Sequence, residues 1–122
     1  MTDEVTLTLP AQEDFRHVAH LVVGGLGARR DMTYDELEDL QVAFDAILGC
    51  REDDDDVVVT MSIEDGVVRA SVGPFGEAAL EQLDDGSGGL SPRRVIETVC
   101  DTMAMTERDG ACWVEVTKRM SS

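Results

Sequence analysis

The chain has 122 residues, of which 43% are hydrophobic, enough for one domain with a buried core and too few for two. We therefore expect a single domain over residues 1–122. The 26 acidic and 10 basic residues give a formal net charge of −16, which repels nucleic-acid phosphates and argues against direct DNA or RNA binding. The charge favours either simple solubility or attraction to a basic partner surface.

The N-terminus and the cysteines limit the cellular setting. No run of about 18 apolar residues occurs, and the N-terminal MTDEVT lacks a secretory pattern, so we expect a cytoplasmic protein without membrane contact. Cys50, Cys100 and Cys112 are widely spaced and include no CxxC pair, which predicts reduced thiols rather than disulfides or a zinc site. His17 and His20 lack a third ligand nearby, so no metal site is indicated.

The first two expected elements are a strand and a helix. Val5, Leu7 and Leu9 alternate with threonines until Pro10, which is typical of a short strand. Apolar residues then recur at helical spacing through roughly residues 12–29. These residues are Phe15, Val18, Ala19, Val22 and Leu26. Three glycines, Gly24, Gly25 and Gly27, weaken the second half of this helix.

Residues 35–50, DELEDLQVAFDAILGC, predict an amphipathic helix. Thr33 and Glu36 have the spacing of a capping box at its start. Its core-facing residues recur at helical spacing: Leu37, Leu40, Phe44, Ile47 and Leu48.

A β-hairpin is predicted next, because Asp65–Gly66 is the two-residue signal for a type I′ turn. With Glu64 opposite Val67, the register places six apolar residues on one face as three cross-strand pairs. The pairs are Ile63 with Val68, Met61 with Ala70, and Val59 with Val72. The other face is either wet or meets a partner, and it carries Thr60, Ser62, Glu64, Arg69 and Ser71.

The C-terminal third predicts a connection, a helix and a last strand. Residues 75–90 contain a short helical stretch, EAALEQL, and a flexible DDGSGGL. Ser91 and Pro92 begin a helix that carries Val95, Ile96, Val99, Cys100 and Met103. After Asp109–Gly110, a strand follows with Cys112, Val114 and Val116 on one side. The order predicts an α+β fold, a two-layer α/β sandwich in which three main helices cover one face of a mostly antiparallel sheet of about four strands.

The segment LVVGGLGARRDMTYDELEDLQVAF, residues 21–44, resembles bacterial anti-sigma factors, the serine-protein kinases of the histidine-kinase-like ATPase superfamily. The resemblance extends from VTLTLPA near the start to GACWVEVTKRM near the end, and it implies the fold of that superfamily. In the family the second helix carries a catalytic Glu and, four residues on, a magnesium-binding Asn. The matching positions here are Ala46 and Cys50. Neither a methyl group nor a thiol serves as a general base or as a ligand for a hard cation.

The two other nucleotide-binding motifs of the family are also altered. In VRASVGPFG, Pro74 stands at the position of the adenine-binding Asp and Gly76 at that of the glycine. Proline has no side-chain acceptor, so the main contact to adenine is expected to be absent. A phosphate-binding turn survives in part at Gly88, Gly89, Ser91 and Arg93. An ordinary capped helix start explains these residues equally well.

The resemblance and the altered motifs together predict a non-catalytic, anti-sigma-factor-like regulator with a degenerate nucleotide pocket and no cofactor. It would bind a sigma factor or an anti-anti-sigma protein, and a homodimer through an exposed sheet face or edge is also expected. The alternative is an active kinase that uses ATP and Mg²⁺ through divergent motifs, with Asp45, Glu52 or Asp53 as nearby candidates. An interaction domain that serves another pathway remains a third interpretation.

Partner contacts are expected first on the exposed side of the first helix and just beyond its C-terminal end. The candidate residues are Arg16, His20, Arg29, Arg30, Tyr34 and Asp35.

Overall fold

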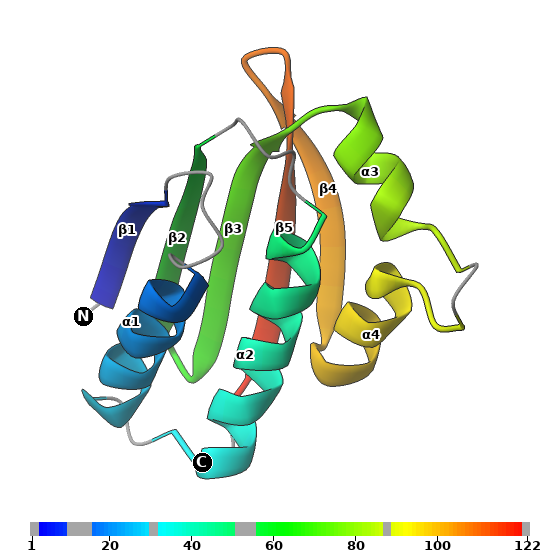
Figure 1. Cartoon of the computed structure of the whole chain (residues 1–122). Coiled ribbons are helices and arrows are strands. Elements are labelled where there is room, and N and C mark those ends of the chain that lie inside the picture. The colour runs from blue at the N-terminus through cyan, green and yellow to red at the C-terminus, as the bar shows by residue number, and fades with distance from the viewer. Residues whose placement is uncertain (1–2, 10–15, 30–31, 51–55, 87–88, 121–122) are drawn as a thin grey trace.

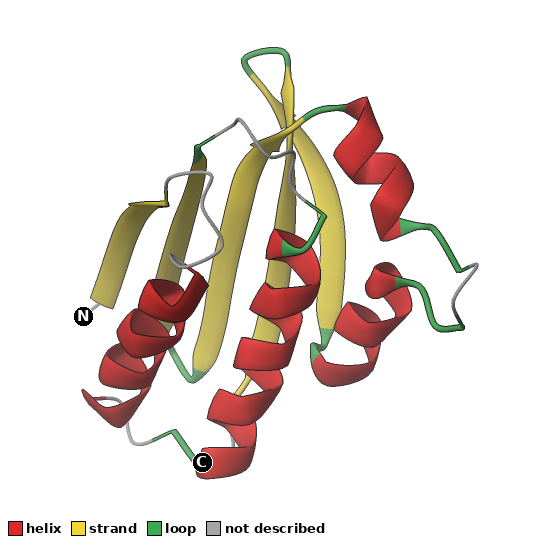
Figure 2. Ribbon diagram, in the orientation of Figure 1, coloured by secondary structure: helices red, strands yellow, loops and turns green. Residues whose placement is uncertain are grey.

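The computed structural model describes residues 3–9, 16–29, 32–50, 56–86 and 89–120, and Figure 1 traces them from blue to red. The four helices of the described residues lie on one side of the sheet, so this part of the molecule has two layers (Figures 1 and 2). The elements in chain order are β1 (Asp3–Leu9), α1 (Arg16–Arg29), α2 (Tyr34–Leu48), β2 (Val57–Glu64), β3 (Val67–Phe75), α3 (Glu77–Leu83), α4 (Pro92–Val99), β4 (Thr102–Arg108) and β5 (Ala111–Arg119).

The sheet has five strands in the order β1-β2-β3-β5-β4, and every neighbouring pair is antiparallel. Its two hairpins turn through Asp65–Gly66 and Asp109–Gly110, where both residues of each pair have positive φ, as a type I′ turn requires. The predicted register of the first hairpin is confirmed: Ile63 faces Val68, Met61 faces Ala70 and Val59 faces Val72. All six of these side chains lie in the core or at its border.

Helix α2 forms for the reasons that the sequence predicts. Thr33 and Glu36 make both hydrogen bonds of the capping box, at 3.2 Å and 2.8 Å. The apolar side of the helix packs on the sheet, and Leu40, Phe44 and Ile47 are at most 1% exposed. Burying side chains of this size contributes about 1.5–3 kcal/mol each, so this contact is a main source of stability.

Helix α1 packs closely against the Leu37 side chain of α2 at Gly27. A Cβ atom added at Gly27 would lie 2.4 Å from the Leu37 Cδ2 atom, which is far inside van der Waals contact. One of the three glycines that weaken α1 therefore has a packing role. No described helix has the length and apolar character needed to cross a membrane.

The last helix and the strand count differ from the prediction. Helix α4 ends at Val99. Helical spacing assigned Met103 to this helix, but the residue lies in an additional strand, β4, which makes five strands among the described residues instead of about four. The backbone turns extended at Cys100, and the Asp101 amide donates to the Thr117 carbonyl at 2.9 Å. Pairing with β5 therefore decides the conformation of this segment. The short α3 is confirmed as predicted.

Lys118 joins three elements on the helix side of the sheet. Its Nζ atom lies 3.0 Å from the Asp39 carboxylate on α2 and donates to the Val99 carbonyl at the end of α4, at 2.8 Å. The side chain is 13% exposed. A cation at this position satisfies a terminal carbonyl and complements the helix dipole.

We predict that Lys118→Met lowers the free energy of unfolding by about 1–3 kcal/mol, because a half-buried carboxylate and a carbonyl lose their donor. Chemical denaturation of the purified variant measures the change. Arg119→Met is the control, since this neighbouring side chain is exposed on the other face of the sheet. Equal stability of the two variants would contradict the role given to Lys118.

Candidate functional site

Helix α2 presents different chemistry on each side. Asp45 turns toward α1, where its Oδ1 atom lies 2.7 Å from His20 Nε2. Ala46 lies about 100° further around the helix, because each residue of an α-helix advances by that angle. It shares a side of α2 with Asp39, seven residues earlier, which contacts Lys118 beside the end of α4. Asp45 therefore points away from the position that Ala46 occupies.

Ala46 and Cys50 offer no group for acid–base chemistry or for Mg²⁺. The Cys50 thiol is buried at 3% exposure and donates to the Ala46 carbonyl at 3.4 Å. Burial raises the pKa of Cys50 and keeps the thiol protonated. The same cause raises the pKa of Cys100 to about 11. A neutral thiol is neither a nucleophile nor a hard-cation ligand.

The end of β3 carries Pro74 and leads to Gly76, the second pair of residues that the resemblance assigns to the nucleotide site. Pro74 is exposed there and has no side-chain donor or acceptor. Gly76 caps α3 without a side-chain hydrogen bond, and α3 begins at the next residue. Leu83 at the other end of α3 is 1% exposed, so this short helix is anchored in the core.

The start of α4 contains Ser91 and Arg93, two of the residues expected to form a phosphate-binding turn. The Ser91 hydroxyl accepts a hydrogen bond from the Arg94 amide at 3.3 Å, as a helix cap does. The Arg93 guanidinium lies 3.1 Å from Asp84 and 4.0 Å from Glu97. Its charge is therefore already offset by two carboxylates. Gly89 has a φ of 121°, and Gly88 lies outside the described residues.

These residues do not fit a nucleotide and its metal ion. Pro74, Ala46 and Cys50 have no carboxylate or amide side chain that could bind adenine, act as a general base or coordinate Mg²⁺. Within the described ranges, no group of three His, Cys, Asp or Glu side chains is placed to hold a metal ion.

The predicted partner residues are spread along the α1–α2 pair rather than gathered at one point. Tyr34 is 78% exposed and Asp35 is exposed beside it, at the start of α2. His20 contacts Asp45, which lies 11 residues from Tyr34 and therefore roughly 16 Å along the helix axis. Arg16 and Arg29 belong to α1, but their side chains, like all of Arg30, lie outside the described residues.

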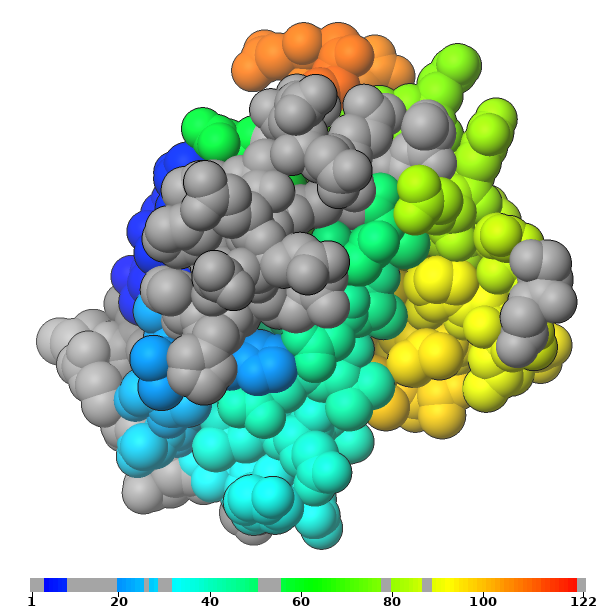
Figure 3. Space-filling view, in the orientation of Figure 1, coloured from blue at the N-terminus to red at the C-terminus, as the bar shows by residue number. Residues whose placement is uncertain are grey.

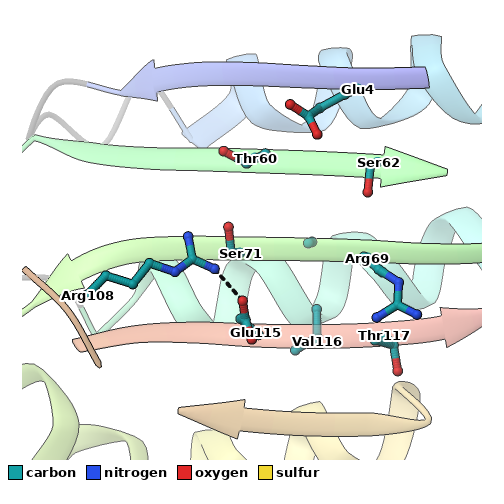
Figure 4. A pocket seen from close by; sticks show the side chains of 10 residues that line it. Glu4, Thr60, Ser62, Arg69, Ser71, Arg108, Glu115, Val116 and Thr117 are labelled. Atoms are coloured by element: carbon teal, nitrogen blue, oxygen red, sulfur yellow. Dashed lines mark hydrogen bonds and ion pairs between the residues drawn. The ribbon is translucent and has the colours of Figure 1, made fainter. Parts of the chain in front are cut away.

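A polar hollow of about 310 Å³ lies on the sheet face opposite the helices, and residue patterns alone did not indicate it (Figure 4). The sequence signal for this face was the alternation of polar residues along β2 and β3. That alternation predicts a polar face but not the hollow, because the hollow is also lined by side chains of β1, β4 and β5. The hollow is lined by Glu4, Thr60, Ser62, Arg69, Ala70, Ser71, Arg108, Glu115, Val116 and Thr117.

Comparison with known proteins gives a match to a curated sequence and matches to solved structures. No protein-family model matches the sequence. The serine-protein kinase RsbW of Halalkalibacterium halodurans is 28% identical over 130 aligned positions, which cover 88% of this chain and 78% of that protein.

The solved structure of the RsbU and RsbW domains of Rv1364c from Mycobacterium tuberculosis matches with a TM-score of 0.70 at 18% identity. The match covers 97% of this chain and 32% of that one, so this chain spans about a third of the solved protein. At this identity the structural match establishes the fold and nothing further. The sequence and structural matches together confirm that the chain resembles, over most of its length, the anti-sigma-factor serine-protein kinases of the histidine-kinase-like ATPase superfamily.

Proposed function

We propose that this chain is an anti-sigma-type regulator that acts by protein binding alone, without ATP, Mg²⁺ or phosphate transfer. The similarity to RsbW supports the regulatory part of the proposal. The non-catalytic part is supported by Ala46 near the end of α2 and the buried Cys50 just beyond it, because the resemblance assigns the catalytic and metal-binding positions of the family to these two residues and neither can do that chemistry. The partner would be a sigma factor or an anti-anti-sigma protein in the cytoplasm, and pairing into a homodimer belongs to the same proposal.

The carboxylates of α2 support the binding of a basic partner to the helix layer. Figure 3 shows that α1, α2 and α4 form this face together. The exposed side of α2 carries Asp35 and Glu38 next to Tyr34 and the half-exposed Val42. An aromatic ring and an aliphatic side chain provide apolar contact area, while carboxylates attract a basic surface and orient it. These groups suit a basic, DNA-contacting region of a sigma factor.

We predict that the purified chain does not bind ATP or ADP up to about 1 mM, with or without Mg²⁺, because both the adenine acceptor and the metal ligand are missing. Isothermal titration calorimetry measures this directly. A serine-protein kinase that retains both groups, titrated with the same nucleotide stock, is the positive control. Micromolar, magnesium-dependent binding would refute the degenerate pocket.

A second prediction concerns the partner surface. Tyr34→Ala combined with Asp35→Lys should weaken copurification with a bound sigma factor about tenfold, because an exposed anchor and an attractive charge are lost together. Glu81→Lys is the matched control, since it makes the same charge change on the exposed side of α3. Unchanged capture by the double variant would exclude this end of α2 from the interface.

The sequence match to a protein named as a serine-protein kinase supports an active kinase as the second candidate. Among the residues proposed for its chemistry, Glu52 and Asp53 lie outside the described residues, and Asp45 is held by His20 on the α1 side. The kinase interpretation predicts magnesium-dependent transfer of ³²P from ATP to an anti-anti-sigma protein, abolished by Asp45→Asn. The non-catalytic interpretation predicts no transfer by either protein.

A further inference from the structure

Strand β1 forms one end of the sheet (Figure 1). Its inner side pairs with β2, and among the described residues no strand pairs with its outer side. Alternate backbone amides and carbonyls of such an edge strand point outward, which makes it a template for another strand. After Glu4 the strand continues VTLTL, without the charged residues or prolines that commonly block pairing. The described structure therefore leaves the outer side of β1 open to strand addition.

The apolar side of β1 is incompletely covered by the helix layer. Val5 and Leu7 pack against the core on this side but are only partly buried, and so is Val22 of α1. A small gap between β1, α1 and β2 is lined entirely by apolar side chains: Val5, Leu7, Val22, Val23, Val59 and Met61. A strand that continued the sheet beyond β1 would add apolar contacts next to this gap and remove Val5 and Leu7 further from water.

The sequence of β1 is complementary to itself in an antiparallel arrangement. A twofold axis through Thr6 places this residue opposite its own copy, Val5 opposite Leu7, and Glu4 opposite Thr8. Because side chains alternate along a strand, the partly buried Val5 and Leu7 of both copies then share the helix side, and the exposed Glu4, Thr6 and Thr8 share the other.

This register also separates the negative charges of the strand. The two Glu4 residues lie four positions apart along the paired strands, which is about 14 Å. The Debye length at physiological ionic strength is about 8 Å, so their repulsion is largely screened. A pairing centred on Thr6 therefore joins apolar to apolar and hydroxyl to hydroxyl positions without a close pair of like charges.

We propose that the outer side of β1 pairs with β1 of a second copy of this chain, so that the two sheets become continuous. Backbone hydrogen bonds hold the strands together, and the Val5–Leu7 pairs, which occur twice in an isologous contact, supply the apolar part. The inference rests on the homodimer of the proposed function and names the surface that forms it. It involves neither the nucleotide residues nor the sigma-factor contact on α2.

Sedimentation equilibrium of the full chain, at about 5–500 µM, measures the association. We expect a dimer that added NaCl strengthens, because screening reduces the repulsion between two chains of net charge −16 and the contact contains no ion pair. A dimer held by ion pairs would instead weaken with salt.

Two variants with the same charge change distinguish the two edges of the sheet. Thr6→Glu places two carboxylates directly opposite each other at the axis and should weaken the dimer about tenfold. Ala104→Glu is the matched control: it lies on β4 at the other edge, in the row that runs from Thr6 through Thr60, Ser71 and Glu115. Ala104 is exposed, and its variant should stay within about twofold of the unmodified chain. Thermal unfolding verifies that each variant is folded.

Crosslinking reads the register. In Thr6→Cys the two new cysteines face each other with Cα atoms about 4.5–5.5 Å apart, a distance that a disulfide spans. In Thr8→Cys they lie about 14 Å apart, too far for a disulfide. Under oxidised glutathione we expect a covalent dimer from Thr6→Cys and none from Thr8→Cys on a non-reducing gel. The unmodified chain is the control for Cys112, which is partly buried.

Three outcomes would overturn the proposal. The first is a chain that stays monomeric over the whole concentration range, which would also remove the homodimer from the proposed function. The second is a dimer that Thr6→Glu and Ala104→Glu weaken equally, and the third is equal crosslinking of the two cysteine variants. These two would exclude β1 as the contact and leave the homodimer in place. The nucleotide and sigma-factor experiments are independent of all three.

Discussion

The structure depends on the burial of one side of α2 against the sheet. Leu40, Phe44 and Ile47 are almost completely excluded from solvent there, and the other elements are placed relative to this helix. Gly27 lets α1 approach it closely, and Lys118 connects it to the end of α4 and to β5. Because the hydrophobic term is large and non-directional, these contacts hold the fold without help from polar groups at a catalytic site.

The residues assigned to the nucleotide site by resemblance have packing and capping roles that do not depend on a bound nucleotide. Ala46 packs against the core near the end of α2, and Cys50, just beyond the helix, is buried in it. Ser91 serves as a helix cap whether or not a phosphate binds near it. Arg93 likewise pairs with Asp84 and Glu97. Residues that look like remnants of a nucleotide site therefore have structural roles of their own, and a fold does not by itself establish an activity.

Local signals in the sequence were sufficient for much of the fold. The Asp65–Gly66 turn and strict alternation set the hairpin register, and Thr33 with Glu36 set the start of α2. The prediction that Met103 belongs to the last helix was wrong because the spacing of this residue suits both a helix and a strand. Pairing with β5, and Lys118 donating to a carbonyl 19 residues away, decided between the two. The polar face of β2 and β3 was predictable, but the hollow around Arg69 needs strands that are distant in sequence.

The uneven distribution of charge gives the molecule an electrical polarity. The carboxylates of α2 lie on one layer, while the opposite layer carries equal numbers of arginines and glutamates on its strands. At physiological ionic strength such a difference is felt over about 8 Å, so an approaching charged protein experiences a torque before any side chains touch. Encounters are thereby sorted by orientation, and a basic body would be turned toward the carboxylates of α2.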